Sequence, residues 1–156
     1  MYLISARCNT WVFDTGSVAH ICNSQEGLQS KRRLEKDEVT MRVGNGCKVD
    51  VVAVGTLPLR LPSGMILVLN KCYYVPALSM NIVCGSSLLQ DRYSFKSETS
   101  GCSIYMNDVF YVHAPDRNGL FILDLNCNDS HINSINSISK RCSFDNDNST
   151  DRKSVV

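Results

Sequence analysis

Alternating hydrophobic and polar residues, interrupted by turn residues at short intervals, are the feature of this sequence that most restricts its fold. Residues 39–43 alternate in this way, and the alternation resumes at Val49 after Gly44-Asn45-Gly46. A period of two places successive side chains on opposite faces of a strand. The segment therefore predicts a β-hairpin with a glycine-bearing tip.

The same pattern continues beyond this hairpin. Residues 52–61 and 65–74 are rich in β-forming residues and meet at Pro62-Ser63-Gly64, a strong turn signal. One short helix is expected at residues 86–90, with its serines as candidate N-caps. Many short strands separated by turns predict an all-β barrel or sandwich. The further strands are expected at 94–98, 102–106, 109–113 and 120–125, with turns at 100–101, 107–108 and 115–119.

A strand that ends in an Asp-Thr-Gly turn precedes both hairpins. Val12 and Phe13 are β-formers that can anchor this strand in a core. After Asp14, Thr15 supplies a hydroxyl, and Gly16 allows two backbones to approach closely. Aspartic proteases present their catalytic carboxylate in this way. The alternative is a plain strand that ends in ordinary turn residues, because three-residue motifs also recur by chance.

Length and charge exclude several classes of protein. The chain has 156 residues, about one domain and too short for a two-lobed enzyme. Its net charge of +1 provides no long-range attraction to nucleic acid or anionic membranes. Residues 24–38 are charged but of mixed sign, which favours a solvated loop over a nucleic-acid patch. The longest apolar run, residues 65–69, is far shorter than a membrane span, and a signal-peptide pattern is absent. We expect a cytoplasmic protein with no membrane contact and no direct nucleic-acid binding.

Eight cysteines raise the question of disulfides or a metal site. No close pairs and no secretion signal accompany them, so we expect reduced thiols, mostly in the core. His20-Ile21-Cys22 offers two potential metal ligands, but there is no C-x-x-C pair and no second cluster with ligand spacing. We therefore predict no metal and no other cofactor. The cysteines occupy positions 8, 22, 47, 72, 84, 102, 127 and 142.

The order of these parts resembles the retropepsins, the homodimeric aspartic proteases of retroviruses and retrotransposons. Within that group the chain is most similar to the protease-region β-barrel of copia-type Pol polyproteins. The similarity spans roughly residues 11–125. Its last part, residues 118–125, resembles the start of the pre-integrase region, although the zinc motif expected further downstream is absent. The similarity is carried by residues 11–23, 43–46, 74–76 and 81–83.

This resemblance implies a small closed β-barrel of the retropepsin (acid protease) type, with extra C-terminal hairpins and a disordered tail. The barrel would occupy residues 1–92, and additional β-hairpins leading into the pre-integrase region would occupy residues 93–125. Residues 126–156 are rich in Asn, Ser and Asp. Such a segment buries too little apolar surface to offset the entropy of ordering, so we expect a flexible polar tail there.

The resemblance also implies roles for the residues of the first turn. Asp14 would be the catalytic carboxylate, and Thr15 would form a hydrogen bond across a dimer. Gly16 would let the two active-site turns abut. The chain contains a single Asp-Thr-Gly sequence, so a catalytic pair of carboxylates requires a homodimer.

Two further segments would complete the site. Gly44, Asn45 and Gly46 fall where the family places its mobile flap tip, which would contact an extended peptide or polyprotein substrate. Gly85 falls at the hydrophobic-hydrophobic-glycine element that packs beneath the active-site turn, with Cys84 in place of the second hydrophobic residue. A simple glycine at the start of a helix is the alternative for Gly85.

Two functions therefore stay open. The first is an aspartic-type endopeptidase of a retrotransposon polyprotein, active only as a homodimer. The second is a catalytically inactive or truncated β-barrel relic that acts as a binding or dimerisation module. A zinc or nucleic-acid module is disfavoured, because paired ligands and a basic face are lacking.

Overall fold

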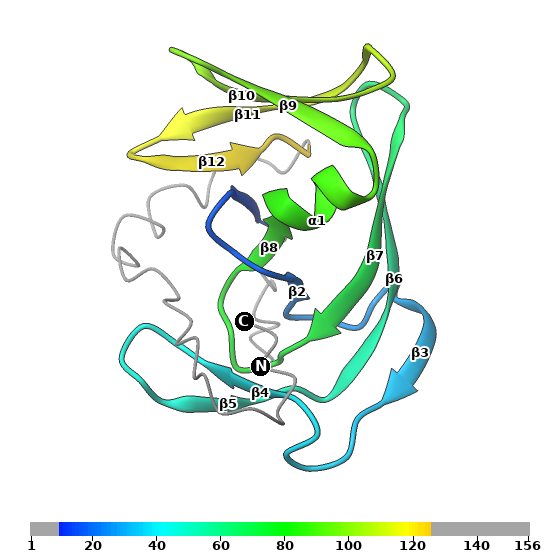
Figure 1. The fold of residues 1–156 in the computed structure, drawn as a ribbon, viewed down its shortest axis with the longest axis vertical. Helices are drawn as coiled ribbons and strands as arrows, with labels where there is room; N and C mark the ends of the chain where they lie inside the picture. Colours follow the sequence, from blue (N-terminus) through cyan, green and yellow to red (C-terminus); the bar gives the residue numbers. More distant parts are fainter. Residues whose placement is uncertain (1–9, 126–156) are drawn as a thin grey trace, which may run out of the picture.

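The computed structural model describes residues 10–125, which form an almost entirely β structure (Figure 1). This confirms the all-β class. The tail predicted at residues 126–156 lies outside the described residues. The elements are β1 (Trp11–Asp14), β2 (His20–Cys22), β3 (Gln29–Arg33), β4 (Thr40–Arg42), β5 (Lys48–Asp50), β6 (Ala53–Arg60), β7 (Ile66–Tyr74), β8 (Asn81–Cys84), α1 (Gly85–Gln90), β9 (Tyr93–Glu98), β10 (Gly101–Met106), β11 (Val109–Arg117) and β12 (Leu120–Leu123).

Both predicted hairpins are present. Strands β4 and β5 pair in antiparallel register around the tip at residues 43–47, and they form a two-stranded sheet of their own. Strands β6 and β7 pair around Pro62-Ser63-Gly64, where Gly64 has a left-handed backbone with φ of +83°. Figure 1 shows β4–β5 at one end of the molecule and β9–β12 at the opposite end.

The large sheet is open, whereas the resemblance implied a closed barrel. Its ten strands follow the order β3-β6-β7-β2-β8-β1-β12-β11-β10-β9, so β3 and β9 are its two edges. Strand β1 has both of its edges occupied, by β8 and by β12. The ladder therefore continues outward through β11 and β10 instead of returning to β3. The edge at β3 is interrupted by an irregularity in register between Gln29 and Arg32, a feature typical of protected sheet edges.

Besides shifts of one or two residues at several element ends, the expectations based on sequence did not include strands β2 and β8. Two further elements also differ from the expectations. Strand β3 lies within residues 24–38, which we expected to be a loop. All five of its residues are exposed, and a ladder formed by backbone groups needs no hydrophobic pattern. Strand β11 runs to Arg117, so the turn expected at residues 115–119 is reduced to Asn118-Gly119. Both of these residues have positive φ, as a two-residue hairpin turn requires.

The predicted short helix is present, but its N-cap differs. The cap is Cys84, whose Sγ accepts a hydrogen bond from the backbone N–H of Ser87 at 3.4 Å. The sequence pattern had favoured the serines, because hydroxyl oxygens are the usual capping acceptors. Within residues 10–125, no helix is long and apolar enough to span a membrane.

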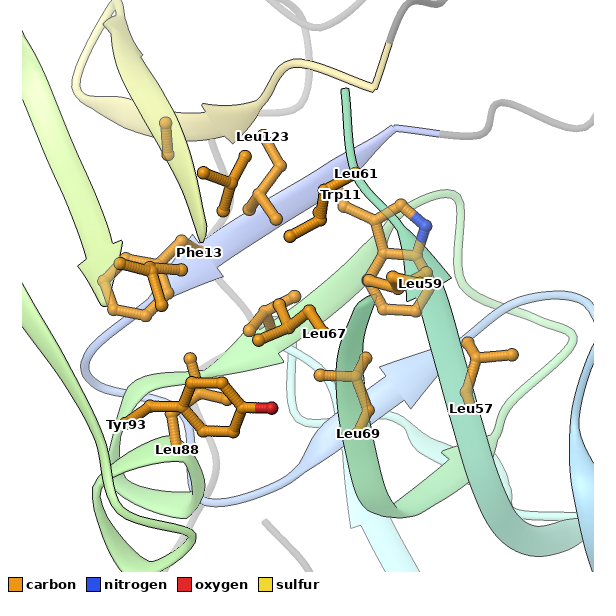
Figure 2. Close-up of a cluster of buried hydrophobic side chains, with 14 of the residues drawn as sticks. Trp11, Phe13, Leu57, Leu59, Leu61, Leu67, Leu69, Leu88, Tyr93 and Leu123 are labelled. Atoms are coloured by element: carbon orange, nitrogen blue, oxygen red, sulfur yellow. The ribbon is translucent and has the colours of Figure 1, made fainter. Parts of the chain in front are cut away.

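Hydrophobic side chains form two clusters on opposite faces of the central strands. Neighbouring residues of β7 and β8 divide between them: Cys72 and Val83 face the larger cluster, and Tyr73 and Ile82 face the smaller one. This alternation is the period-two pattern seen in the sequence. The larger cluster joins β1, β6 and β7 to α1, β9 and β12. Figure 2 labels its members Trp11, Phe13, Leu57, Leu59, Leu61, Leu67, Leu69, Leu88, Tyr93 and Leu123.

Candidate active site

The Asp-Thr-Gly turn lies over the end of β8. Strand β8 is inserted between β1 and β2: it pairs in parallel with β1, placing Cys84 beside Asp14, and in antiparallel orientation with β2. The loop of residues 15–19, which connects β1 to β2, therefore crosses the C-terminal end of β8. This topology brings the last residue of β8 and the first residue of α1 beneath the turn.

Asp14 is half-buried, and the two residues after it are exposed. Its Oδ1 accepts a hydrogen bond from the backbone N–H of Gly16 at 2.8 Å. Ser17 then turns inward: it is buried, and its Oγ donates to the carbonyl oxygen of Ala19 at 2.9 Å. The sequence Asp14-Thr15-Gly16 thus forms a tight turn that leaves a carboxylate accessible at its start.

Gly85 packs directly against this turn. A Cβ at Gly85 would lie 3.1 Å from Thr15 Cα and 3.3 Å from Phe13 Cζ, closer than ordinary van der Waals contact. Gly85 is also the first residue of α1. The two interpretations of this glycine, as part of the packing beneath the turn and as a helix start, therefore describe the same position.

His20 is a buried residue of the site that the sequence indicated only as a potential metal ligand. Its Nδ1 accepts a hydrogen bond from the backbone N–H of Cys84 at 2.9 Å. Its Nε2 has no hydrogen-bond partner among residues 10–125. Burial lowers the pKa of the imidazole from 6.5 to about 4, because a charged ring would lose its hydration. The available signal was the segment His20-Ile21-Cys22 itself, which reads as a short strand whose first and third residues share a face.

The Gly44-Asn45-Gly46 tip is held by bonds within its own hairpin. The backbone N–H of Val43 donates to the carbonyl of Cys47 at 3.0 Å, and that of Gly46 donates to the carbonyl of Val43 at 2.7 Å. The Asn45 Oδ1 accepts from the N–H of Cys47 at 2.9 Å. All three predicted tip residues are exposed. The structure thus brings Gly85 to the Asp14 turn, whereas the tip is a separate, locally built element.

The described cysteines form no metal site. Residues 10–125 contain no group of three or more His, Cys, Asp or Glu side chains placed to hold a metal ion. Their five cysteines are free, and all but Cys47 are buried. In the core, a hydrogen bond between the thiols of Cys22 and Cys72 lowers the pKa of Cys22 and raises that of Cys72.

One protein-family model matches the part of the chain that contains most of these elements. The model described as Pol polyprotein, beta-barrel domain, matches residues 11–93, more than half of the chain. The match begins at β1 and extends through the Asp-Thr-Gly turn, both hairpins, β8 and α1 to the first residue of β9. No curated protein and no solved structure matches this chain.

Proposed function

Since this chain belongs to the family of Pol polyprotein beta-barrel domains, we propose that it is the aspartic-type endopeptidase of a copia-type retrotransposon polyprotein. The observation that carries the proposal is the Asp14 turn. Its carboxylate is accessible, accepts the N–H of Gly16 at 2.8 Å, and rests on a turn packed against Gly85. The large sheet is open and not a closed barrel. The retropepsin-type fold is therefore itself proposed, and the proposed function does not rest on it.

The proposed reaction needs two copies of the chain. The sequence holds one Asp-Thr-Gly, so a homodimer would contribute one Asp14 from each protomer. Two carboxylates in contact cannot both be ionised, and the pair would share one proton. The ionised member would remove a proton from a bound water molecule, and the protonated member would stabilise the oxygen of the tetrahedral intermediate. This chemistry requires neither a metal nor an organic cofactor.

The β4–β5 hairpin would act as the flap over the substrate. Its tip is exposed and is held by few bonds of its own, as an element that opens and closes requires. When closed, its backbone would meet an extended peptide in the manner of an added strand. The substrate would be the polyprotein or a peptide derived from it, cleaved in the cytoplasm.

Replacing Asp14 by Asn tests this proposal directly. The amide is nearly isosteric but cannot act as a base, so Asp14→Asn should abolish hydrolysis of a capsid-derived peptide library while fold and dimer persist. Asp116 provides a matched control. Its Oδ1 accepts the N–H of Gly119 at 2.8 Å, the same kind of bond from a glycine amide to a carboxylate as at Asp14, although the turn spans one residue more. Asp116→Asn should leave hydrolysis unchanged.

Mixing the two proteins tests the requirement for a pair. Asp14→Asn chains mixed with unmodified chains should form inactive heterodimers, so activity should fall faster than the unmodified fraction. A linear decrease would show that each chain works alone. Undiminished hydrolysis by the Asp14→Asn variant would remove this carboxylate from the mechanism.

The open ladder favours a second candidate, a β-barrel relic that binds or dimerises without cleaving peptides. Its edge strand β9 is unpaired on its outer side within the described residues, and such an edge can take up an added strand. Sedimentation at several protein concentrations, combined with the hydrolysis assay, distinguishes the two functions. A dimer without hydrolysis supports the relic, and a strict monomer excludes the paired mechanism.

A further inference from the structure

The carbonyl oxygen of Ser17, in the middle of the loop after Asp14, receives two side-chain hydrogen bonds from one distant segment. The Sγ of Cys84 donates to it at 2.9 Å, and the Oγ of Ser86 donates to it at 3.3 Å. The two donor atoms are themselves only 3.1 Å apart. Both donors come from the junction of β8 and α1, which lies beneath the loop.

Cys84 also holds the two sides of this loop. Its backbone pairs beside Asp14 in the parallel ladder between β1 and β8. Its N–H donates to Nδ1 of His20, the first residue after the loop, at 2.9 Å. The Cys84 side chain is fully buried. Water therefore does not compete for the hydrogen bond between its thiol and the Ser17 carbonyl. One residue therefore contacts the start, the middle and the end of the segment that carries the candidate carboxylate.

A hydrophobic residue at position 84 would keep the two backbone contacts but would lose the hydrogen bond from the side chain to the Ser17 carbonyl. It would fill the space beneath the loop but would leave the Ser17 carbonyl with the exposed Ser86 hydroxyl as its side-chain donor. Ser17 is itself buried, and the loss of one of the two hydrogen bonds to a buried carbonyl is costly. The loop would then gain freedom to shift, and with it the N–H of Gly16 that binds the Asp14 carboxylate.

We propose that Cys84, assisted by Ser86, is a positioning residue for the Asp14 turn: its thiol fixes the Ser17 carbonyl and thereby keeps Asp14 in its working orientation. The effect on catalysis rests on the proposed function, whereas the effect on the turn does not. Cys84 touches no reacting atom in this proposal and acts only through the loop.

The test compares variants that keep or lose the donor at position 84. Cys84→Val keeps a hydrophobic side chain of similar size but has no hydrogen-bond donor. Cys84→Ala removes both the donor and most of the side-chain volume. Cys84→Ser provides a hydroxyl donor in place of the thiol. Cys102→Ala is the matched control, because Cys102 is equally buried but lies in β10. Amide exchange of Gly16 and Ala19, measured by NMR on the full chain, reports the state of the turn.

Exchange at these two amides should accelerate about five- to tenfold in Cys84→Val and Cys84→Ala, as expected for the loss of one hydrogen bond. It should stay near the unmodified rate in Cys84→Ser and Cys102→Ala. In the hydrolysis assay the donor-free variants should lose about tenfold or more in kcat with little change in KM, because the misplaced group acts after binding.

Unchanged exchange in Cys84→Val and Cys84→Ala, or equal acceleration in Cys102→Ala, would overturn the positioning role. If the unmodified protein hydrolyses no peptide, the proposed function fails, and the exchange rates still decide about Cys84. If neither Cys84→Val nor Cys84→Ala folds, the exchange rate of the Gly16 amide in Ser86→Ala tests the proposal instead. Ser86 is exposed, so its loss should be tolerated while exchange at Gly16 still rises measurably, and an unchanged rate there would overturn the proposal.

Discussion

The Asp14 turn and the Gly44-Asn45-Gly46 tip are both exposed glycine turns, yet they are held in opposite ways. The turn is tied to β8 by bonds that span 64 and 67 residues of sequence, from Cys84 to His20 and to Ser17. The tip is closed by bonds within its own hairpin, all of them between residues 42 and 47. A turn held from a distance keeps a fixed orientation, and a turn held only by itself is free to move with its hairpin. These are the properties required of a catalytic turn and of a flap.

The largest expected difference between the two elements appears on acidification. The pKa of His20 is 6.5 when the chain is unfolded and about 4 when it is buried. Between these values the unfolded state binds more protons, so lowering the pH favours unfolding. The contribution of neutral His20 is complete above pH 6.5, decreases as the pH falls to about 4, and amounts to roughly 3 kcal/mol.

Urea unfolding at pH 7 and pH 4, compared with His20→Gln, measures this effect. The variant should be less stable than the unmodified protein at pH 7 and should lack this part of the pH dependence. Protonation of Nδ1 also removes the acceptor for Cys84, so the protection of the Ala19 amide, measured as its intrinsic exchange rate at each pH divided by its observed rate, should fall on acidification more than that of the Gly46 amide. Equal pH dependence in His20→Gln would contradict this role for the imidazole.

A smaller effect is expected when a methyl group is added beneath the turn. Gly85→Ala places a Cβ 3.1 Å from the backbone of Thr15, which cannot rotate away as a flexible side chain would. We expect a loss of about 1–2 kcal/mol in unfolding free energy, since overpacking costs more here than the gain in helix propensity. Calorimetry measures it, with Gln90→Ala, an exposed change in the same helix, as the control. Unaltered stability would show that the backbone of Thr15 can move away from the added methyl group without loss of unfolding free energy.

The smallest effect is expected at the tip. Gly46 and Gly64 have φ of +81° and +83°, and an added Cβ would meet nothing within 4 Å at either position. Gly46→Ala and Gly64→Ala should therefore each cost about 1 kcal/mol, through backbone strain alone. If the β4–β5 tip is a flap, only Gly46→Ala should also reduce turnover. Equal turnover in the two variants, with equal losses in melting temperature, would refute the flap role.

Local pattern alone determined most of the secondary structure of this chain. The two hairpins, the strand before Asp14 and the short helix after Cys84 all follow from alternation and turn residues a few positions apart. Strand β3 was not predicted, because an exposed edge strand pairs through its backbone and shows no hydrophobic periodicity in the sequence. The thiol N-cap of α1 was not predicted either, because cysteine is not a usual capping residue.

The residues of the candidate site likewise fall into those that local sequence predicted and those that only the tertiary structure revealed. The sequence by itself identified Asp14, Thr15 and Gly16 as a turn and related Gly85 to it by resemblance. Only the tertiary structure decided that β8 lies between β1 and β2, that the ladder stays open, and that His20 and Cys84 hold the loop. The physical reason is range. Alternation and turn propensity act over a few neighbouring residues, whereas the choice of strand partners depends on burial and hydrogen bonds formed between segments more than sixty residues apart.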